Sequence, residues 1–239
     1  MPALAVLSNV TVGPFFAREL RRIADEPLIL PAGYNTWVQD LLQPSANLLA
    51  SKAVFLLLDG CELLGGRGVD FPQNPEAALQ PFMDVIAGFK KRFPHVLLMV
   101  STLDIPQRTL LPGASPRNEV GLMAWWRAQI SALQLPVIEL AEIAARMGRT
   151  QFYSEKMWYY GSLPYSMQGE KSLAHACARG FRGVLGIKRK CLVLDLDHTL
   201  WGGVVGENGT EGLVLAEHGE GAIYRDFQKR IQELHRQGI

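Results

Sequence analysis

Short apolar runs alternate with segments of helical periodicity over the first 140 residues, and this alternation limits the fold more than any other feature. The clearest run, Ala53–Gly60, is almost continuously apolar, as central strands of a parallel sheet are, because both of their faces are buried. Repetition of strand and helix over about five units is the pattern of an open sheet with helices on both faces. The sequence therefore predicts an α/β fold with a doubly wound parallel sheet. The expected strands are Ala3–Leu7, Leu28–Leu30, Ala53–Gly60, His95–Ser101 and Pro136–Leu140.

Helical periodicity fills the segments between these runs. Pro14 opens one such segment, in which Phe16 and Leu20 fall on a single apolar face. A longer one, Pro75–Phe93, contains Pro81, which is expected to interrupt the helix because proline has no backbone N–H. Further helices are expected at Thr36–Leu42, Asn118–Leu133, Ala141–Gly148 and Glu170–Phe181.

A change of pattern after residue 181 predicts a domain boundary. The segment 182–190, "RGVLGIKRK", is basic and contains glycine, and it reads as a linker between a first domain at 1–181 and a second at 191–239. The second begins with another apolar run, "CLVLD", which predicts a strand. A turn-rich segment follows, and Ile223, Phe227 and Ile231 then recur at helical spacing. The second domain is thus expected to start with one βα unit.

Composition excludes several classes of protein. The 24 Lys and Arg nearly balance the 23 Asp and Glu, so the basic excess of a nucleic-acid-binding protein is missing. Cys61, Cys177 and Cys191 form no C-x-x-C pair, which argues against a zinc site or a disulfide framework. Neither a signal peptide nor a membrane-spanning run is recognisable. We therefore expect a cytoplasmic protein with no nucleic-acid or membrane partner.

Two aspartates, Asp195 and Asp197, lie at the end of the "CLVLD" run. In α/β sheets, ligands bind beyond the carboxyl ends of the strands, so both carboxylates are expected at a ligand crevice. Neighbouring carboxylates repel unless a cation or proton lies between them, and Mg²⁺ prefers such hard oxygen ligands. One aspartate could then attack a phosphoryl group while the other transfers protons. The alternative, a merely polar strand end, leaves the specific string that follows unexplained.

That string, "LVLDLDHTLWGG", resembles the first motif of the haloacid dehalogenase-like (HAD) phosphatases and, more narrowly, that of the FkbH-like proteins. The resemblance implies that Asp195 is the nucleophile and Asp197 the general acid/base. It also implies that the Asp195 carboxylate and the Asp197 backbone carbonyl bind Mg²⁺. In the same scheme, Thr199, Gly202 and Gly203 would support the loop. His198 departs from the family pattern, which usually has Asn at that position.

The resemblance carries further expectations about function. HAD enzymes also need a Ser or Thr, a Lys and another acidic residue, all downstream of the helix that closes this sequence, so 1–239 is expected to be an inactive N-terminal piece. The FkbH resemblance implies transfer of a glyceryl group from a phosphorylated three-carbon acid to an acyl carrier protein, with dephosphorylation. The alternatives are a phosphatase acting on a small phosphorylated metabolite, and a non-catalytic docking role for the first domain.

The first domain resembles the N-terminal domain of FkbH-like proteins, which has an SGNH-hydrolase-like, flavodoxin-like fold. The strings that carry this are "LSNVTVGPF", "GYNTWVQDLLQPSANL", "VFLLLDG" and "MWYYGSLPYS". Ser8 occupies the place of the SGNH nucleophile, but the late segment "YSEKMWYY" lacks the required histidine. We therefore interpret Ser8 and its neighbour Asn9 as hydrogen-bonding residues at a strand end. Asp59 stands where an oxyanion donor would be needed. We expect a hydrolase fold without hydrolase chemistry, and an SGNH esterase is the less favoured alternative.

Overall fold

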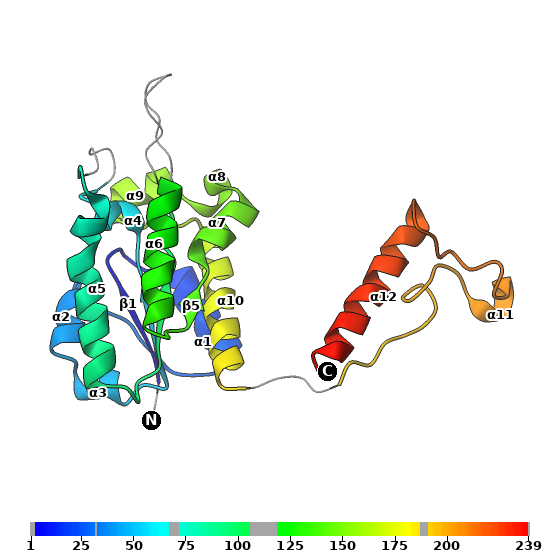
Figure 1. Cartoon of the computed structure of the whole chain (residues 1–239), viewed down its shortest axis with the longest axis horizontal. Helices are drawn as coiled ribbons and strands as arrows, with labels where there is room; N and C mark the ends of the chain where they lie inside the picture. The colour runs from blue at the N-terminus through cyan, green and yellow to red at the C-terminus, as the bar shows by residue number, and fades with distance from the viewer. Residues whose placement is uncertain (1–2, 32, 67–71, 106–118, 187–190, 239) are drawn as a thin grey trace, which may run out of the picture. The chain divides into compact units, whose positions relative to one another are not determined.

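The computed structural model describes residues 3–31, 33–66, 72–105, 119–186 and 191–238. The chain divides into two units, Met1–Leu185 and Gly186–Ile239 (Figure 1). Each is described by itself below.

A five-stranded sheet, parallel throughout, forms the centre of the first unit. Its strand order is β2-β1-β3-β4-β5, so the chain adds strands outward from β1 in both directions. Such an arrangement needs crossover connections, and helices supply them on both faces. The predicted doubly wound parallel sheet is therefore confirmed. The strands are β1 (Leu4–Ser8), β2 (Leu28–Ile29), β3 (Ala53–Leu57), β4 (Leu98–Ser101) and β5 (Val137–Ile138).

Alternation along the strands divides the core into two layers. Leu4 and Val6 of β1 face one layer, while Ala5 and Leu7 face the other. Each fully buried aliphatic side chain of this kind stabilises the fold by roughly 1.5–3 kcal/mol. One layer is completed by α1 (Pro14–Ala24), α7 (Leu140–Met147) and α10 (Met167–Val184), and the other by α2 (Trp37–Leu42), α5 (Pro75–Arg92) and α6 (Glu119–Ala132) (Figure 1).

Helix α5 runs without a break through Pro81, so the predicted interruption is wrong. Proline removes one backbone hydrogen bond, but Leu79, Met83 and Ile86 bury the inner face of the same helix in the core. Burial of this apolar face offsets the missing backbone hydrogen bond, so tertiary packing keeps the helix continuous.

The remaining helices of the first unit are short. The aromatic segment after residue 148 forms two of them. An isolated antiparallel bridge joins Tyr153, which lies between these two helices, to Tyr165, which lies just before α10. Helix α10 extends to Val184, three residues into the segment that the sequence suggests as a linker. The short helices are α3 (Ala46–Leu49), α4 (Gly60–Leu63), α8 (Arg149–Phe152) and α9 (Glu155–Gly161).

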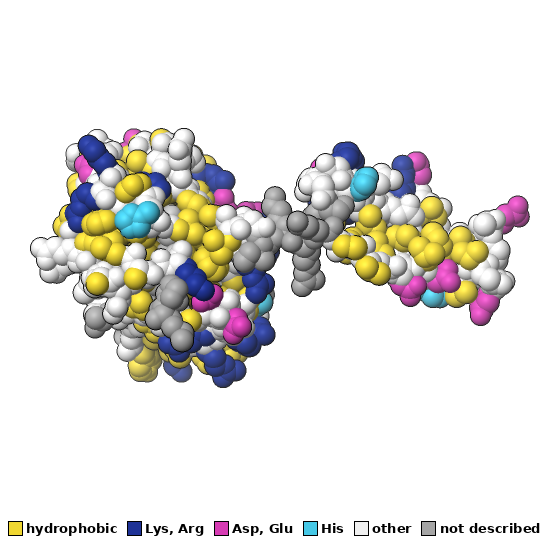
Figure 2. Space-filling model, turned by 90° about the horizontal axis from the view of Figure 1, so that it is seen from below, with side chains coloured by type: hydrophobic (Ala, Val, Ile, Leu, Met, Phe, Trp, Pro, Cys, Tyr) yellow, Lys and Arg dark blue, Asp and Glu magenta, His cyan; other side chains and the backbone are white. Residues whose placement is uncertain are grey.

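The second unit contains α11 (Val205–Asn208) and α12 (Glu220–Arg236), the latter at the predicted place. The run 191–195, "CLVLD", forms no strand, so this part of the prediction is wrong. A strand needs a hydrogen-bonded neighbour, and none pairs with this run among residues 191–238. Val193 is consequently 88% exposed, and Figure 2 shows hydrophobic side chains along the visible surface of this unit.

No helix within the described residues is long and apolar enough to cross a membrane.

Candidate functional site

The two predicted catalytic aspartates lie in a turn rather than on a strand. The backbone N–H groups of Thr199 and Leu200 both donate to the Leu196 carbonyl, at 3.3 and 2.8 Å, which folds the chain back directly after Asp195. His198 adopts a left-handed conformation with φ of 54° inside this turn. The turn keeps both aspartates in one short loop at the surface of the second unit.

Asp197 is the more firmly held of the pair. Its Oδ1 accepts hydrogen bonds from the Trp201 indole N–H at 3.0 Å and from the Val205 backbone N–H at 3.3 Å. The side chain is half-buried, whereas that of Asp195 is exposed. Among the described residues, the Asp195 Oδ1 accepts a hydrogen bond only from the next residue's N–H, at 2.8 Å. The loop thus presents one open carboxylate beside one whose orientation is fixed.

The glycines behind this loop are required by close packing and by backbone conformation. Gly202 exchanges two backbone hydrogen bonds with Val214, at 3.0 and 2.8 Å, and a Cβ added to it would lie 2.9 Å from the Val214 Cβ. Gly203 has φ of 99°, a region that other residues rarely adopt. Its N–H donates to His198 Nδ1 at 3.3 Å, so the imidazole closes the loop where an amide would also serve.

Whether this loop can hold Mg²⁺ depends on its donor atoms. Asp195 and Asp197 offer carboxylate oxygens of the kind that the ion prefers. The second oxygen of Asp197 takes no hydrogen bond from any described residue and remains open to a ligand. No cluster of three or more Asp, Glu, His or Cys side chains suited to a metal occurs in the described part of the chain. The donor set fits magnesium chemically but supplies only two acidic side chains.

Ser8, Asn9 and Asp59 come together at the carboxyl edge of the sheet in the first unit. The Asn9 side chain donates to the Asp59 carbonyl at 2.9 Å and accepts from the Asp59 N–H at 2.8 Å, which joins the ends of β1 and β3. Ser8 is buried, and its Oγ accepts from the Val10 N–H at 3.2 Å. The Asp59 carboxylate caps α4 by accepting from the Glu62 N–H at 3.1 Å. No histidine bonds to Ser8 among the described residues, so the geometry gives Ser8 no general base.

A buried ion pair at the same edge is missing from the sequence-based candidates. The Asp104 side chain is completely buried, and Arg149 binds it through Nη2 at 2.7 Å and Nε at 3.1 Å. Tyr153 donates its hydroxyl to the same carboxylate at 2.9 Å. Burial raises the pKa of Tyr153 well above its ordinary value, and the negative charges of Asp104 and Asp59 raise it further. Tyr153 therefore stays a neutral donor that holds Asp104 in place.

Glu170 is a second buried carboxylate that the sequence did not single out. Its Oε2 accepts from the Phe16 N–H at 3.0 Å and so satisfies a donor at the start of α1, whose own first turn has no acidic residue. Burial raises the pKa of Glu170, although the backbone N–H groups of Phe16 and Phe15 oppose the shift. Gly13 makes room for this contact, because a Cβ there would lie 1.7 Å from Glu170 Oε1. The local sequence around α1 does not predict this cap, because Glu170 is distant from α1 in the chain.

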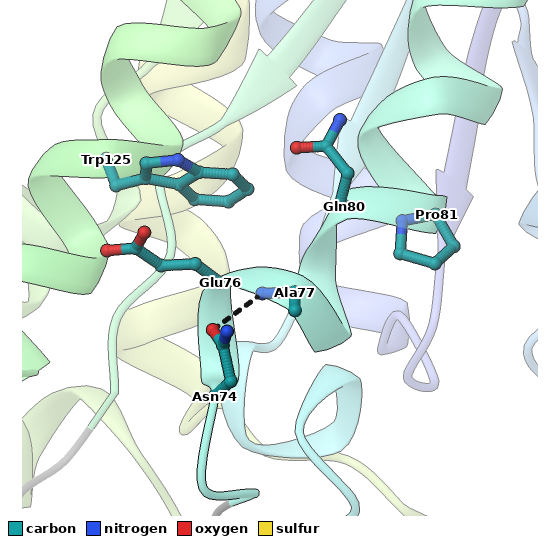
Figure 3. A pocket seen from close by; sticks show the side chains of 6 residues that line it. All are labelled: Asn74, Glu76, Ala77, Gln80, Pro81 and Trp125. Atoms are coloured by element: carbon teal, nitrogen blue, oxygen red, sulfur yellow. Dashed lines mark hydrogen bonds between the residues drawn. The ribbon is translucent and has the colours of Figure 1, made fainter.

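An open groove of about 450 Å³ lies between α5 and α6 and contains none of the predicted site residues. Figure 3 shows the indole of Trp125 and the side chain of Gln80 at this opening, with the Asn74 side chain accepting from the Ala77 N–H at 3.1 Å. That bond is the N-terminal cap of α5, and Gln80 donates to Asp84 on its own helix. Asn74 and Gln80 thus make their hydrogen bonds within α5, and the groove adds no further functional group to the site.

Comparison with known proteins gives structural matches only. No protein-family profile matches the sequence, and no curated protein is significantly similar to it. One similar solved structure is the N-terminal part of protein BF1531 from Bacteroides fragilis, containing a phosphatase domain complexed with Mg. It is 18% identical, with a TM-score of 0.75, and the match covers 99% of this chain and 66% of that one.

Two lipases are also similar in structure. A lipase/acylhydrolase from Enterococcus faecalis is 16% identical with a TM-score of 0.55, covering 77% of this chain and 97% of its own. The lipase Lip_vut3 from a goat rumen metagenome is 12% identical with a TM-score of 0.53, and the match covers 75% of this chain and 97% of the lipase chain. At these identities the likenesses establish the fold. They agree with a phosphatase-like and a lipase-like fold in one chain, and they do not support the narrower FkbH resemblance.

Proposed function

We propose that the second unit handles phosphoryl groups, with Asp195 as nucleophile and Asp197 as general acid/base. The observation that carries this proposal is the difference between the two carboxylates of one loop. Asp195 is exposed and accepts a hydrogen bond only from Leu196 in the described part of the chain, while Trp201 and Val205 fix the orientation of Asp197. A nucleophile must be open to substrate, and a proton-transfer group must be held in place.

The proposed reaction has two steps. A carboxylate oxygen of Asp195 attacks phosphorus, the bond to the leaving oxygen breaks, and Asp197 gives that oxygen a proton. Asp197 then removes a proton from water as water attacks the aspartyl-phosphate, which releases phosphate and restores Asp195. Mg²⁺ held by the Asp195 carboxylate and the Asp197 backbone carbonyl would neutralise the charge of the phosphoryl group and leave the Asp197 carboxyl group for proton transfer. This metal is part of the proposal, supported by the donor set and by the magnesium complex of the Bacteroides fragilis protein.

The substrate class that we propose is a small phosphorylated metabolite. The narrower possibility, transfer of a glyceryl group from a phosphorylated three-carbon acid to an acyl carrier protein, is a further proposal that rests only on the string 192–203. Since the chain spans 66% of the Bacteroides fragilis chain, the activity of the whole protein is likewise a proposal.

For the first unit we propose a non-catalytic role as a folded domain attached to the phosphoryl-handling one. Its strand-end carboxylates, Asp59 and Asp104, are engaged by the protein's own donors. Ser8 has no histidine partner among the described residues. Ser8→Ala should therefore leave activity within a few-fold of wild type, whereas loss of a true nucleophile costs orders of magnitude.

The experiment is phosphate release from a generic aryl phosphate and from phosphoglycerate with Mg²⁺. It compares the wild-type protein with its Asp195→Asn and Ser8→Ala variants. We expect turnover by wild type and Ser8→Ala, and none by Asp195→Asn. An active Asp195→Asn protein would exclude Asp195 as the nucleophile. Reaction of Ser8 with a fluorophosphonate would instead support an esterase.

A further inference from the structure

We propose that a groove between α7 and α10 of the first unit binds an organic anion with a short apolar arm, through a carboxylate or phosphate head. The groove has a volume of about 370 Å³, within the range of small-ligand sites. It lies in the first unit and does not involve the aspartate loop, so it stands independently of the proposed phosphoryl chemistry.

Helical spacing brings the lining residues onto two facing stripes. Ile143, Arg146 and Met147 are three and four residues apart on α7, which places them on one face of that helix. Ser172, His175 and Arg179 follow the same rule on α10, which packs against α7 (Figure 1). The groove is therefore formed by two packed helices of the folded unit, and its shape does not depend on a loop.

Its floor is apolar. Ile143 and Met147 are partly buried and pack against the core layer that contains α1, α7 and α10. Their outer surfaces remain in the groove, where an apolar arm of a ligand would remove them from water. Such burial favours binding in proportion to the area covered.

The rim of the groove carries positive charge, part of which is not paired with a carboxylate of the described residues. Arg179 makes no ion pair and Ser172 no side-chain hydrogen bond in the described part of the chain. Arg146 pairs with Glu142 on its own helix, and this exposed pair can open at little cost. The planar guanidinium of Arg179 can bind a carboxylate or phosphate through two parallel hydrogen bonds.

His175, at the edge of the groove, already interacts with the carboxylate of Glu19. Its Nε2 lies 3.0 Å from Glu19 Oε1, and Arg22 lies 2.6 Å from the same oxygen. Hydrogen bonding to Arg22, with a smaller contribution from His175, lowers the pKa of Glu19 to about 2. Arg22 and His175 balance the negative charge of the Glu19 carboxylate. Arg179 therefore remains the main residue for binding the anionic head of a ligand.

The test uses residues 1–239 at pH 7 and low salt, with binding followed by NMR or calorimetry. The probes are hexanoate, hexyl phosphate, uncharged hexanol, and acetate or inorganic phosphate, which lack the arm. We expect binding by hexanoate or hexyl phosphate, with the tighter of the two identifying the head, and binding at least roughly fivefold weaker for hexanol and the small anions.

Two variants and a matched control separate the groove from general surface charge. Arg179→Gln should weaken binding roughly tenfold and Met147→Gln several-fold. Arg230→Gln removes an exposed arginine of the second unit and should change nothing. Circular dichroism melting checks that each variant is folded. The proposal is overturned if neither charged probe binds below about 10 mM, if hexanol binds equally well, or if Arg179→Gln and Arg230→Gln behave alike.

Discussion

Aspartates follow apolar segments in both units of this chain, but their surroundings differ. Asp104 of the first unit has a completely buried side chain that accepts hydrogen bonds from Arg149 and Tyr153. Asp195 of the second unit is exposed and, within the residues that the structure describes, accepts only from its neighbour's N–H. The partners of a carboxylate, and not its place after an apolar run, decide whether it stabilises the fold or remains open to a ligand.

The apolar segments themselves show the same contrast. Phe55 lies in β3 between two neighbouring strands and is inaccessible to solvent. Val193 lies in an equally apolar run but is 88% exposed, without a strand beside it among the described residues. An apolar run becomes a strand only where a partner completes its hydrogen bonds.

The largest expected effect comes from Asp195→Asn. Under the proposed mechanism the amide cannot act as nucleophile, so phosphate release should fall by at least about a thousandfold. The free energy of unfolding should change by less than about 0.5 kcal/mol, because the side chain is exposed. Steady-state kinetics and denaturant unfolding measure the two quantities. A large loss of stability would show that Asp195 is structural.

The same substitution in the first unit, Asp104→Asn, should have the opposite profile. It leaves Arg149 and Tyr153 without their anionic partner, which we expect to destabilise the first unit by about 2–3 kcal/mol. The expected cost lies below the range for fully buried pairs, about 3–5 kcal/mol, because Arg149 is 44% exposed and can regain water. Activity of the folded protein should persist.

Stability of the first unit can be read selectively in a Trp201→Phe background. The other four tryptophans, Trp37, Trp125, Trp126 and Trp158, all lie in the first unit, so fluorescence then reports on that unit alone. An unchanged unfolding midpoint for Asp104→Asn would mean that the buried ion pair contributes nothing.

A second pair of variants tests the contrast between the apolar segments. Val54→Ala removes two methyl groups from a buried position in β3 and should cost about 2 kcal/mol through lost burial and a residual cavity. Val193→Ala changes an exposed position and should cost less than about 0.5 kcal/mol. Both are measured by denaturant unfolding of the chain. Comparable costs would indicate that residues 191–195 pack against a partner in solution.

The smallest effect concerns the buried carboxylate at the start of α1. Because the pKa of Glu170 is raised, the folded state holds its proton more tightly than the unfolded state. Its stabilising contribution is therefore complete below the ordinary value of 4.5 and is lost as pH rises through the folded pKa.

Glu170→Gln cannot ionise and keeps an oxygen that can accept from Phe16. Relative to this variant, the wild type should become less stable between about pH 4 and pH 7. Unfolding at several pH values, in the Trp201→Phe background, gives the comparison. A wild type that gains stability over the variant as pH rises would contradict the assigned direction.

Part of the fold could be predicted from the sequence because the determining interactions are local or repetitive. Continuously apolar runs such as Ala53–Gly60 identify strands buried on both faces, and their alternation with helical periodicity gives the parallel sheet. The proximity of Asp195 and Asp197 likewise follows from the sequence, because they are two positions apart, although the strand predicted before them does not form.

The remaining features depended on residues that are distant in sequence. Arg149 meets Asp104 across 45 positions, and Glu170 meets Phe16 across 154, and neither pair has a local signature. Helix α5 continues through Pro81 because its other residues bury their inner face. The sequence by itself determined the periodicities and the proximity of Asp195 and Asp197. Only the tertiary structure decided which apolar run found a strand partner and which carboxylates found donors, because both depend on contacts that form when separate segments pack together.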